Sequence, residues 1–214
     1  MKSEIETLLE IKPFSLTQKE KNEIFSKAMN ESIKFHYEKS VEFRKICDNR
    51  DFLPGDTLSV ETIPFLPVSL FKKFQLRSVP ESEIIKTIYS SATTSNSPSK
   101  IFLDKITSKR QTKALISIMK DFLVDKKNFL IIDQKSDLNN SKEVKSRESA
   151  IRGFFPFMES ISFCLDSNLK LDTTKIESFR SGNYCIMGFT WLLYTIILEN
   201  ENNNLVREFF RKIK

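Results

Sequence analysis

From residue 84 onward, short apolar runs alternate with segments whose apolar residues recur at helical spacing. This alternation restricts the fold more than any other feature, because it predicts a sheet with helices packed on it. The expected strands are residues 84–89, 100–103, 128–133, 161–166 and 184–188. The expected helices are residues 106–124, 147–158, 173–181, 189–199 and 204–213. We therefore predict an α/β fold for this part of the chain.

The N-terminal part of the chain has a different pattern, which predicts a helical layer before the sheet. Residues 3–10 are expected to form a short amphipathic helix that ends before Pro13. Thr17 or Ser15 is suited to cap the next helix. Apolar residues then continue at helical spacing up to Cys47, as one long helix or as two with a break.

A connector with little hydrophobic periodicity follows, and it contains four prolines between residues 54 and 80. Residues 63–68 should be extended, and a short helix is expected over residues 69–74. We expect a helical N-terminal segment and connector over residues 1–80. An α/β subdomain of the nucleotide-binding type is expected over residues 81–214, in one continuous structural unit with the first segment.

The most distinctive stretch lies between the first two expected strands. Seven of the ten residues from Ser90 to Ser99 carry hydroxyls, and Lys100 closes the stretch. A turn that only reverses the chain normally uses Gly, Asn or Asp. Hydroxyls, backbone N–H groups and an ammonium are instead the groups that bind phosphate oxygens. The alternative is a flexible Ser/Thr-rich connection without a ligand.

The charge distribution argues against a nucleic-acid-binding function, and the single histidine argues against a metal site. The net charge is +6, but the basic residues are interspersed with acidic ones. A solvated surface is therefore expected and not a nucleic-acid site. His36 is the only histidine. Because no second histidine accompanies it and no cysteine lies nearby, we interpret His36 as a structural or surface residue and predict no metal site.

The cysteines and apolar runs indicate a cytoplasmic protein. Cys47, Cys164 and Cys185 are far apart and lack metal-ligand spacing, so buried reduced thiols are expected. Reduced thiols are typical of the cytoplasm. The polar and acidic start predicts no secretion signal. The longest apolar stretch, residues 185–198, is too short for a transmembrane segment.

Four stretches resemble known enzymes, in order along residues 55–195. Ser90-Ser91-Ala92-Thr93-Thr94-Ser95 with Pro98-Ser99-Lys100 resembles the phosphate-binding motif Ser-Ser-Gly-Thr-Thr-Gly of acyl-adenylate-forming enzymes, which a Ser-Lys or Pro-Lys follows. The other stretches resemble segments of the acyl-protein synthetases of bacterial bioluminescence, the LuxE-like family. They are residues 63–78, residues 147–154 and Gly188-Phe189-Thr190-Trp191.

The resemblance implies a fold and an activity. The fold would be part of the large domain of acyl-adenylate-forming enzymes. Such enzymes use ATP and Mg²⁺ to convert a carboxylic acid, here expected to be a fatty acid, into an acyl-adenylate, and then transfer the acyl group to a thiol. The β- and γ-phosphates would be held by the hydroxyls of Ser90, Ser91, Thr93, Thr94 and Ser95. Lys100 would be the catalytic cation that neutralises their charge.

Two departures from the family leave alternatives open. Ala92 and Ser95 replace motif glycines that permit positive φ and close approach to phosphate. No counterpart of the family's later parts, which include the acyl-accepting cysteine, is found after Asn200. The chain is therefore expected to be an incomplete ligase, truncated or completed by a second polypeptide. The alternatives are an inactive relative that acts as a binding or scaffold subunit, and an unrelated α/β domain with a Ser-rich loop.

Overall fold

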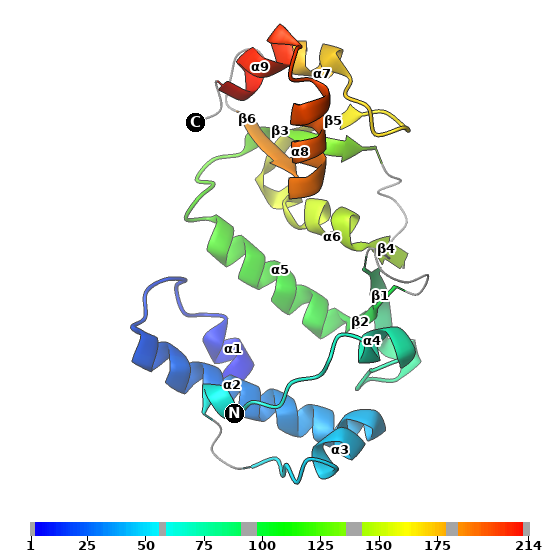
Figure 1. Cartoon of the computed structure of the whole chain (residues 1–214). Helices are drawn as coiled ribbons and strands as arrows, with labels where there is room; N and C mark the ends of the chain where they lie inside the picture. Colours follow the sequence, from blue (N-terminus) through cyan, green and yellow to red (C-terminus); the bar gives the residue numbers. More distant parts are fainter. Residues whose placement is uncertain (1–2, 56–58, 91–97, 136–142, 179–183, 212–214) are drawn as a thin grey trace. The chain divides into compact units, whose positions relative to one another are not determined.

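The computed structural model describes residues 3–55, 59–90, 98–135, 143–178 and 184–211. The chain divides into two compact units, each built from two separate segments. The first unit contains Met1–Met119 and Asn140–Ser149, and the second contains Lys120–Asn139 and Ala150–Lys214. Helices and strands occur in both units, so the predicted mixed α/β architecture is confirmed (Figure 1).

Three helices open the first unit: α1 (Glu4–Leu8), α2 (Gln18–Lys39) and α3 (Val41–Asp48). Helix α2 begins at a capping box, in which the Thr17 hydroxyl accepts from the Glu20 N–H and the Glu20 carboxylate accepts from the Thr17 N–H. Thr17 is therefore the cap. Ser40 breaks the long helical stretch in two, because its extended backbone ends α2 while its hydroxyl accepts from Phe43 N–H and caps α3.

The connector contains short elements only. These are the 3₁₀ helices η1 (Val60–Thr62) and η2 (Glu81–Glu83) and the single-turn helix α4 (Leu70–Lys73). The helix expected over residues 69–74 is thus confirmed as α4.

A mixed three-stranded sheet completes the first unit, with β1 (Ile84–Tyr89) in its centre. On one side β1 pairs antiparallel with β2 (Lys100–Asp104), and on the other it pairs parallel with β4 (Glu143–Lys145). Helix α5 (Lys105–Met119) continues directly from β2. The Asp104 carboxylate accepts from Thr107 N–H at 2.7 Å and so stabilises the start of α5.

The second unit is built on a parallel sheet in the order β5-β3-β6. Its strands are β3 (Lys127–Gln134), β5 (Met158–Leu165) and β6 (Tyr184–Gly188). The central strand β3 is an unbroken apolar run from Phe129 to Ile132, as expected for a strand covered on both faces. Helices α7 (Thr173–Ser178), α8 (Thr190–Glu199) and α9 (Asn204–Arg211) bury Ile176, Leu192, Ile196, Val206 and Phe209 in the same core.

Two predictions of local structure are wrong. The helix expected over residues 147–158 is α6 (Ser146–Gly153), which ends at a glycine; the 3₁₀ helix η3 (Phe155–Phe157) follows, and residue 158 already belongs to β5. The second error is an omission, because none of the five expected strands corresponds to β4. Within the described residues, the strands form two sheets and not one.

Within the described residues, no helix combines the length and apolar character needed to cross a membrane.

Gly188 is a packing requirement at the end of β6. A Cβ atom there would lie 2.8 Å from Ile132 Cβ and 3.0 Å from Leu193 Cγ, both closer than van der Waals contact. We therefore expect Gly188→Ala to lower the free energy of unfolding by about 1–3 kcal/mol. Urea unfolding followed by the fluorescence of Trp191, the only tryptophan, measures this change. The exposed Ser167→Ala is the control, and equal stability of the two variants would contradict the packing argument.

Candidate functional site

Ser90 and Ser99 close the loop between β1 and β2. The Ser90 N–H donates to the Ser99 carbonyl oxygen at 3.1 Å, and the Ser99 N–H donates to Ser90 Oγ at 2.9 Å. These bonds extend the antiparallel ladder beyond the Tyr89–Lys100 pair. Ser90 and Lys100, which the sequence predicts as phosphate ligands, thus lie at the base of the loop. The other predicted phosphate ligands, Ser91, Thr93, Thr94 and Ser95, lie outside the described residues.

Ser99 contributes a buried hydroxyl that has no hydrogen-bond partner among the residues that the structure describes. Its side chain is 5% exposed, and Oγ makes no hydrogen bond in the described part of the chain. A buried polar group without a partner costs about 1–3 kcal/mol, and such groups in folded proteins call for an explanation. An oxygen of a bound anion would supply the missing hydrogen bond, because a hydroxyl can donate as well as accept.

Sheet pairing places a second lysine at the base of the same loop. Tyr89 pairs with Lys100 on β2 and with Lys145 on β4, so the two lysines flank the last residue of β1. Paired residues of adjacent strands lie on the same face of a sheet. Neither ammonium group has an ion-pair partner among the residues that the structure describes. Two such cations around a loop of hydroxyls favour a polyanion.

Lys145 is the residue that sequence reasoning missed. It follows a polar stretch without periodicity, and only its pairing with β1 brings it to the loop. A strand of three residues with one buried side chain, Val144, has too little pattern to be recognised in a sequence.

Two of the three other stretches of the resemblance contribute to packing, whereas Phe65 and Val68 in the third are largely exposed. Ile151 in α6 is buried, and Phe154 contacts Phe129 with ring centroids 6.3 Å apart. Gly188 allows the end of β6 to approach β3 closely. In the first unit, Ser149 of α6 accepts a hydrogen bond from Lys86 of β1 at 3.5 Å. These two stretches therefore support the two sheets.

His36 makes contacts that fit a structural residue. Its Nδ1 lies 2.7 Å from Ser78 Oγ, and its ring packs edge-on against Phe35 and Phe43. Desolvation by these neighbours lowers the pKa of His36. Among the described residues, no group of three or more His, Cys, Asp or Glu side chains is arranged to hold a metal ion.

The cysteines are free thiols, and Cys164 is fully buried. Its Sγ donates to the Ile131 carbonyl oxygen at 3.2 Å, and burial raises the pKa of the Cys164 thiol to about 12. Burial also raises the pKa of Cys47 and of the half-buried Cys185. Because the thiolate is the nucleophile, these shifts disfavour all three as acyl acceptors.

The pKa of Cys164 leads to a test by alkylation. At pH 8 in native buffer, we expect iodoacetamide to leave Cys164 unmodified, since the thiol is both buried and protonated. In urea, Cys164 should react at the rate of an ordinary cysteine. Peptide mass spectrometry measures the rate of alkylation in native buffer and in urea, with the half-buried Cys185 as the internal control. Native labelling of Cys164 as fast as that of Cys185 would contradict the burial argument.

Comparisons with known proteins agree on one family. Residues 1–206 match the family model described as "Acyl-protein synthetase, LuxE". A curated relative, the long-chain-fatty-acid–luciferin-component ligase of Aliivibrio fischeri, is 26% identical over 213 residues. The match covers 95% of this chain and 54% of the relative, so the chain spans about half the length of the curated relative. The family model covers nearly the whole chain, and the chain therefore belongs to the LuxE family of acyl-protein synthetases.

Proposed function

We propose that this chain takes part in the ATP-dependent activation of a carboxylic acid, specifically a fatty acid, to an acyl-adenylate whose acyl group then passes to a thiol. The observation that carries the proposal is the base of the β1–β2 loop. It combines the buried hydroxyl of Ser99 with the cations Lys100 and Lys145. The relative named as a long-chain fatty acid ligase supports the choice of acid.

The residues at the loop base suit the chemistry of this step. An oxygen of the acid's carboxylate attacks the α-phosphorus of ATP, and pyrophosphate leaves. A protein accelerates such a step by holding two anions together and by neutralising the developing negative charge. In the proposal, Lys100 and Lys145 supply that charge, while Ser90 and Ser99 contact phosphate oxygens. No general base is required, because the carboxylate is already ionised at neutral pH.

Magnesium is part of the proposal as the ion that accompanies ATP. Mg²⁺ commonly keeps several waters and binds substrate phosphates with one or two carboxylates, so a site made of protein ligands alone is not required. In this proposal the phosphates together with water molecules would provide most of its ligands. The lysines at the loop base would share the neutralisation of the remaining charge.

The complete reaction is proposed for the chain together with the part of the enzyme that the match leaves uncovered. The match covers 54% of the relative. The other groups that the reaction needs would therefore come from further sequence or from a second polypeptide. The acyl acceptor would be a thiol other than Cys47, Cys164 and Cys185, whose raised pKa values make them poor nucleophiles. A cytoplasmic location, with ATP available and thiols reduced, belongs to the same proposal.

A second candidate function is a binding or scaffold subunit without catalysis. It is favoured by Ala92 and Ser95, which stand where the family's motif has glycines. A side chain at a backbone position that needs positive φ costs about 1–3 kcal/mol. Such a loop would bind phosphates more weakly, and the chain would then serve only as a binding partner.

Nucleotide binding is tested by thermal unfolding. Mg·ATP should raise the melting temperature of the chain, since a ligand that binds only the folded state stabilises it. We expect Lys100→Ala to abolish the rise and Lys145→Ala to weaken binding about fivefold. Lys109→Ala removes an exposed lysine of α5 and is the matched control. No rise at millimolar Mg·ATP, or a rise that neither variant changes, would contradict the assignment.

Catalysis is tested by acid-dependent exchange of pyrophosphate into ATP. We expect exchange when the chain is mixed with the product of the neighbouring downstream gene, and none from the chain alone. Exchange by the chain alone would contradict the need for further sequence. Persistent Mg·ATP binding without exchange in the mixture would favour the second candidate function.

A further inference from the structure

Helix α8 of the second unit has apolar side chains on every side. Between Trp191 and Leu198, Thr195 is the only residue whose side chain is neither aliphatic nor aromatic. One side of the helix packs into the core, where Leu192 and Ile196 are buried. A helix that is apolar all round is typical of a position that is buried on all sides.

The side of α8 opposite the core is nevertheless exposed. Tyr194 is 64% exposed, Trp191 52%, Leu198 50% and Ile197 46%. Because these residues are three or four positions apart, their side chains lie on one face of the helix. We call these four residues the outer face of α8.

The neighbouring helices of the same unit have polar surfaces. The exposed residues of α9 are Asn204, Arg207, Glu208 and Arg211, and the exposed residues in the described part of α7 are polar as well. Both helices bury apolar side chains in the core that they share with α8. The apolar outer face is therefore a property of α8 and not of the surface of the second unit in general.

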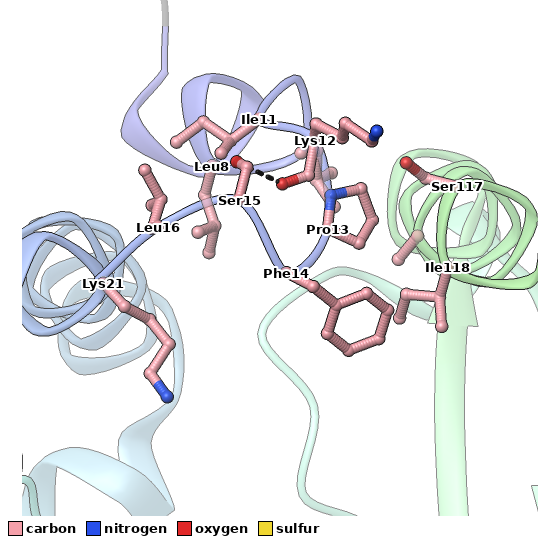
Figure 2. A pocket seen from close by; sticks show the side chains of 12 residues that line it. Leu8, Ile11, Lys12, Pro13, Phe14, Ser15, Leu16, Lys21, Ser117 and Ile118 are labelled. Carbon is pink, nitrogen blue, oxygen red and sulfur yellow. Dashed lines mark hydrogen bonds between the residues drawn. The ribbon is translucent and has the colours of Figure 1, made fainter. Parts of the chain in front are cut away.

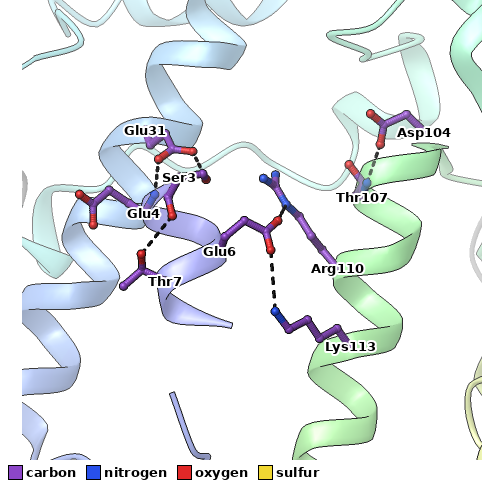
Figure 3. Close-up of polar contacts among 9 residues, drawn as sticks. All are labelled: Ser3, Glu4, Glu6, Thr7, Glu31, Asp104, Thr107, Arg110 and Lys113. Atoms are coloured by element: carbon purple, nitrogen blue, oxygen red, sulfur yellow. Dashed lines mark hydrogen bonds and ion pairs between the residues drawn. The ribbon is translucent and has the colours of Figure 1, made fainter. Parts of the chain in front are cut away.

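In the first unit, by contrast, helices of this chain cover one another. The Glu6 carboxylate of α1 accepts a hydrogen bond from Arg110 Nε of α5 at 2.7 Å and so holds the two helices together (Figure 3). An apolar cavity of about 550 Å³ lies between α5 and the segment that joins α1 to α2, and Leu8, Leu16 and Ile118 line it (Figure 2). These side chains face other parts of the first unit. The described part of the second unit leaves the outer face of α8 about half exposed.

The size of the outer face indicates what kind of partner covers it. Two aromatic and two aliphatic side chains, each about half exposed, present about 300–400 Å² of apolar surface. An interface between domains of one protein buries about 300–750 Å² on each side, which this face matches. Two copies of the chain that met through this face alone would bury only about half of what each partner of a stable complex usually buries. A membrane surface is disfavoured, because interfacial helices carry Lys or Arg and α8 contains neither.

The curated relative supplies a partner of this kind, because the match leaves nearly half of that protein uncovered. We propose that the outer face of α8 is the surface on which this remaining part of the ligase docks, through an apolar surface of its own. Trp191 and Tyr194 are its anchors, since aromatic side chains are enriched in the cores of interfaces and contribute most to binding there. The inference rests on the proposed function, in which further sequence or a second polypeptide completes the ligase. The exposure of the face stands without it.

The proposal is tested on the full chain labelled with 5-fluorotryptophan, which gives one ¹⁹F resonance because Trp191 is the only tryptophan. The labelled chain is titrated with the product of the neighbouring downstream gene, the second polypeptide of the proposed function. We expect a saturable shift of the Trp191 resonance. We also expect this resonance to lose its sensitivity to the exchange of H₂O for D₂O, because the partner would cover the indole ring. A complex that forms without these changes, or the absence of a complex, would overturn the proposal.

Variants with a matched control assign the docking to this face. Tyr194→Lys and Leu198→Lys each place a charge in the proposed interface and should weaken binding of the second polypeptide about tenfold or more. Asn204→Lys adds the same charge at an exposed position of α9 and should leave binding unchanged. A Tyr194→Lys, Leu198→Lys double variant that binds as tightly as the unchanged chain would overturn the proposal.

The chain alone provides a further test. Because Tyr194 and Leu198 are exposed, we expect neither substitution to lower the midpoint of urea unfolding. A lowered midpoint would show that another part of this chain covers the face, and would overturn the proposal. Sedimentation should show a monomer. A dimer that Tyr194→Lys dissociates would assign the face to a second copy of the chain and would also overturn it.

Pyrophosphate exchange separates this inference from the proposed function. Docking needs no catalysis, so a shifted Trp191 resonance without exchange in the mixture would count only against the proposed function. Exchange in the mixture with an unshifted Trp191 resonance would overturn this inference alone.

Discussion

The pairing of β1 on both of its edges is the constraint on which the candidate site depends. Its antiparallel partner β2 returns the chain after the hydroxyl-rich loop, and its parallel partner β4 comes from sequence more than 50 residues away. Together they place Lys100 and Lys145 at the two sides of Tyr89. Hydrogen bonds between Ser90 and Ser99 then close the loop at its base. Without this sheet, the cations and hydroxyls would have no fixed relation to one another.

Most of the elements could be predicted because their patterns are strong. Strand β3 is covered on both faces, and its sequence is therefore an unbroken apolar run. Helices α2 and α9 are each buried along one stripe, so their apolar residues recur at helical spacing. Two failures have physical reasons. The apolar pattern predicts a helix through residue 158, but α6 ends at Gly153 and a 3₁₀ helix that contains Pro156 follows it. Strand β4 has three residues, which are too few to show an alternating pattern. Which strands share a sheet depends on pairing between segments that are distant in sequence. The sequence therefore did not indicate whether the strands form one sheet or two.

The candidate site was predicted in part. The hydroxyl-rich composition and the resemblance identified the loop, and the structure places Ser90 and Lys100 at its base. The buried hydroxyl of Ser99, which has no partner in the described part of the chain, and the position of Lys145 could be found only in the structure, because burial and strand pairing are three-dimensional properties. The apolar cavity beside α5 was not anticipated for the same reason: its walls come from segments about 100 residues apart.

In the proposed function, the loop between β1 and β2 binds phosphates through the cations and hydroxyls at its base. The step that we propose then depends on holding the carboxylate of the acid against these phosphates.

The most direct test of the central claim uses the phosphate chain alone. Calorimetric titration of the chain with inorganic tripolyphosphate, pyrophosphate and phosphate at several salt concentrations isolates the loop from any contact with a nucleoside. We predict saturable binding that strengthens with the number of phosphates, weakens with salt and is lost in the Lys100→Ala, Lys145→Ala double variant. Binding that is absent, or that the double variant retains in full, would contradict the account.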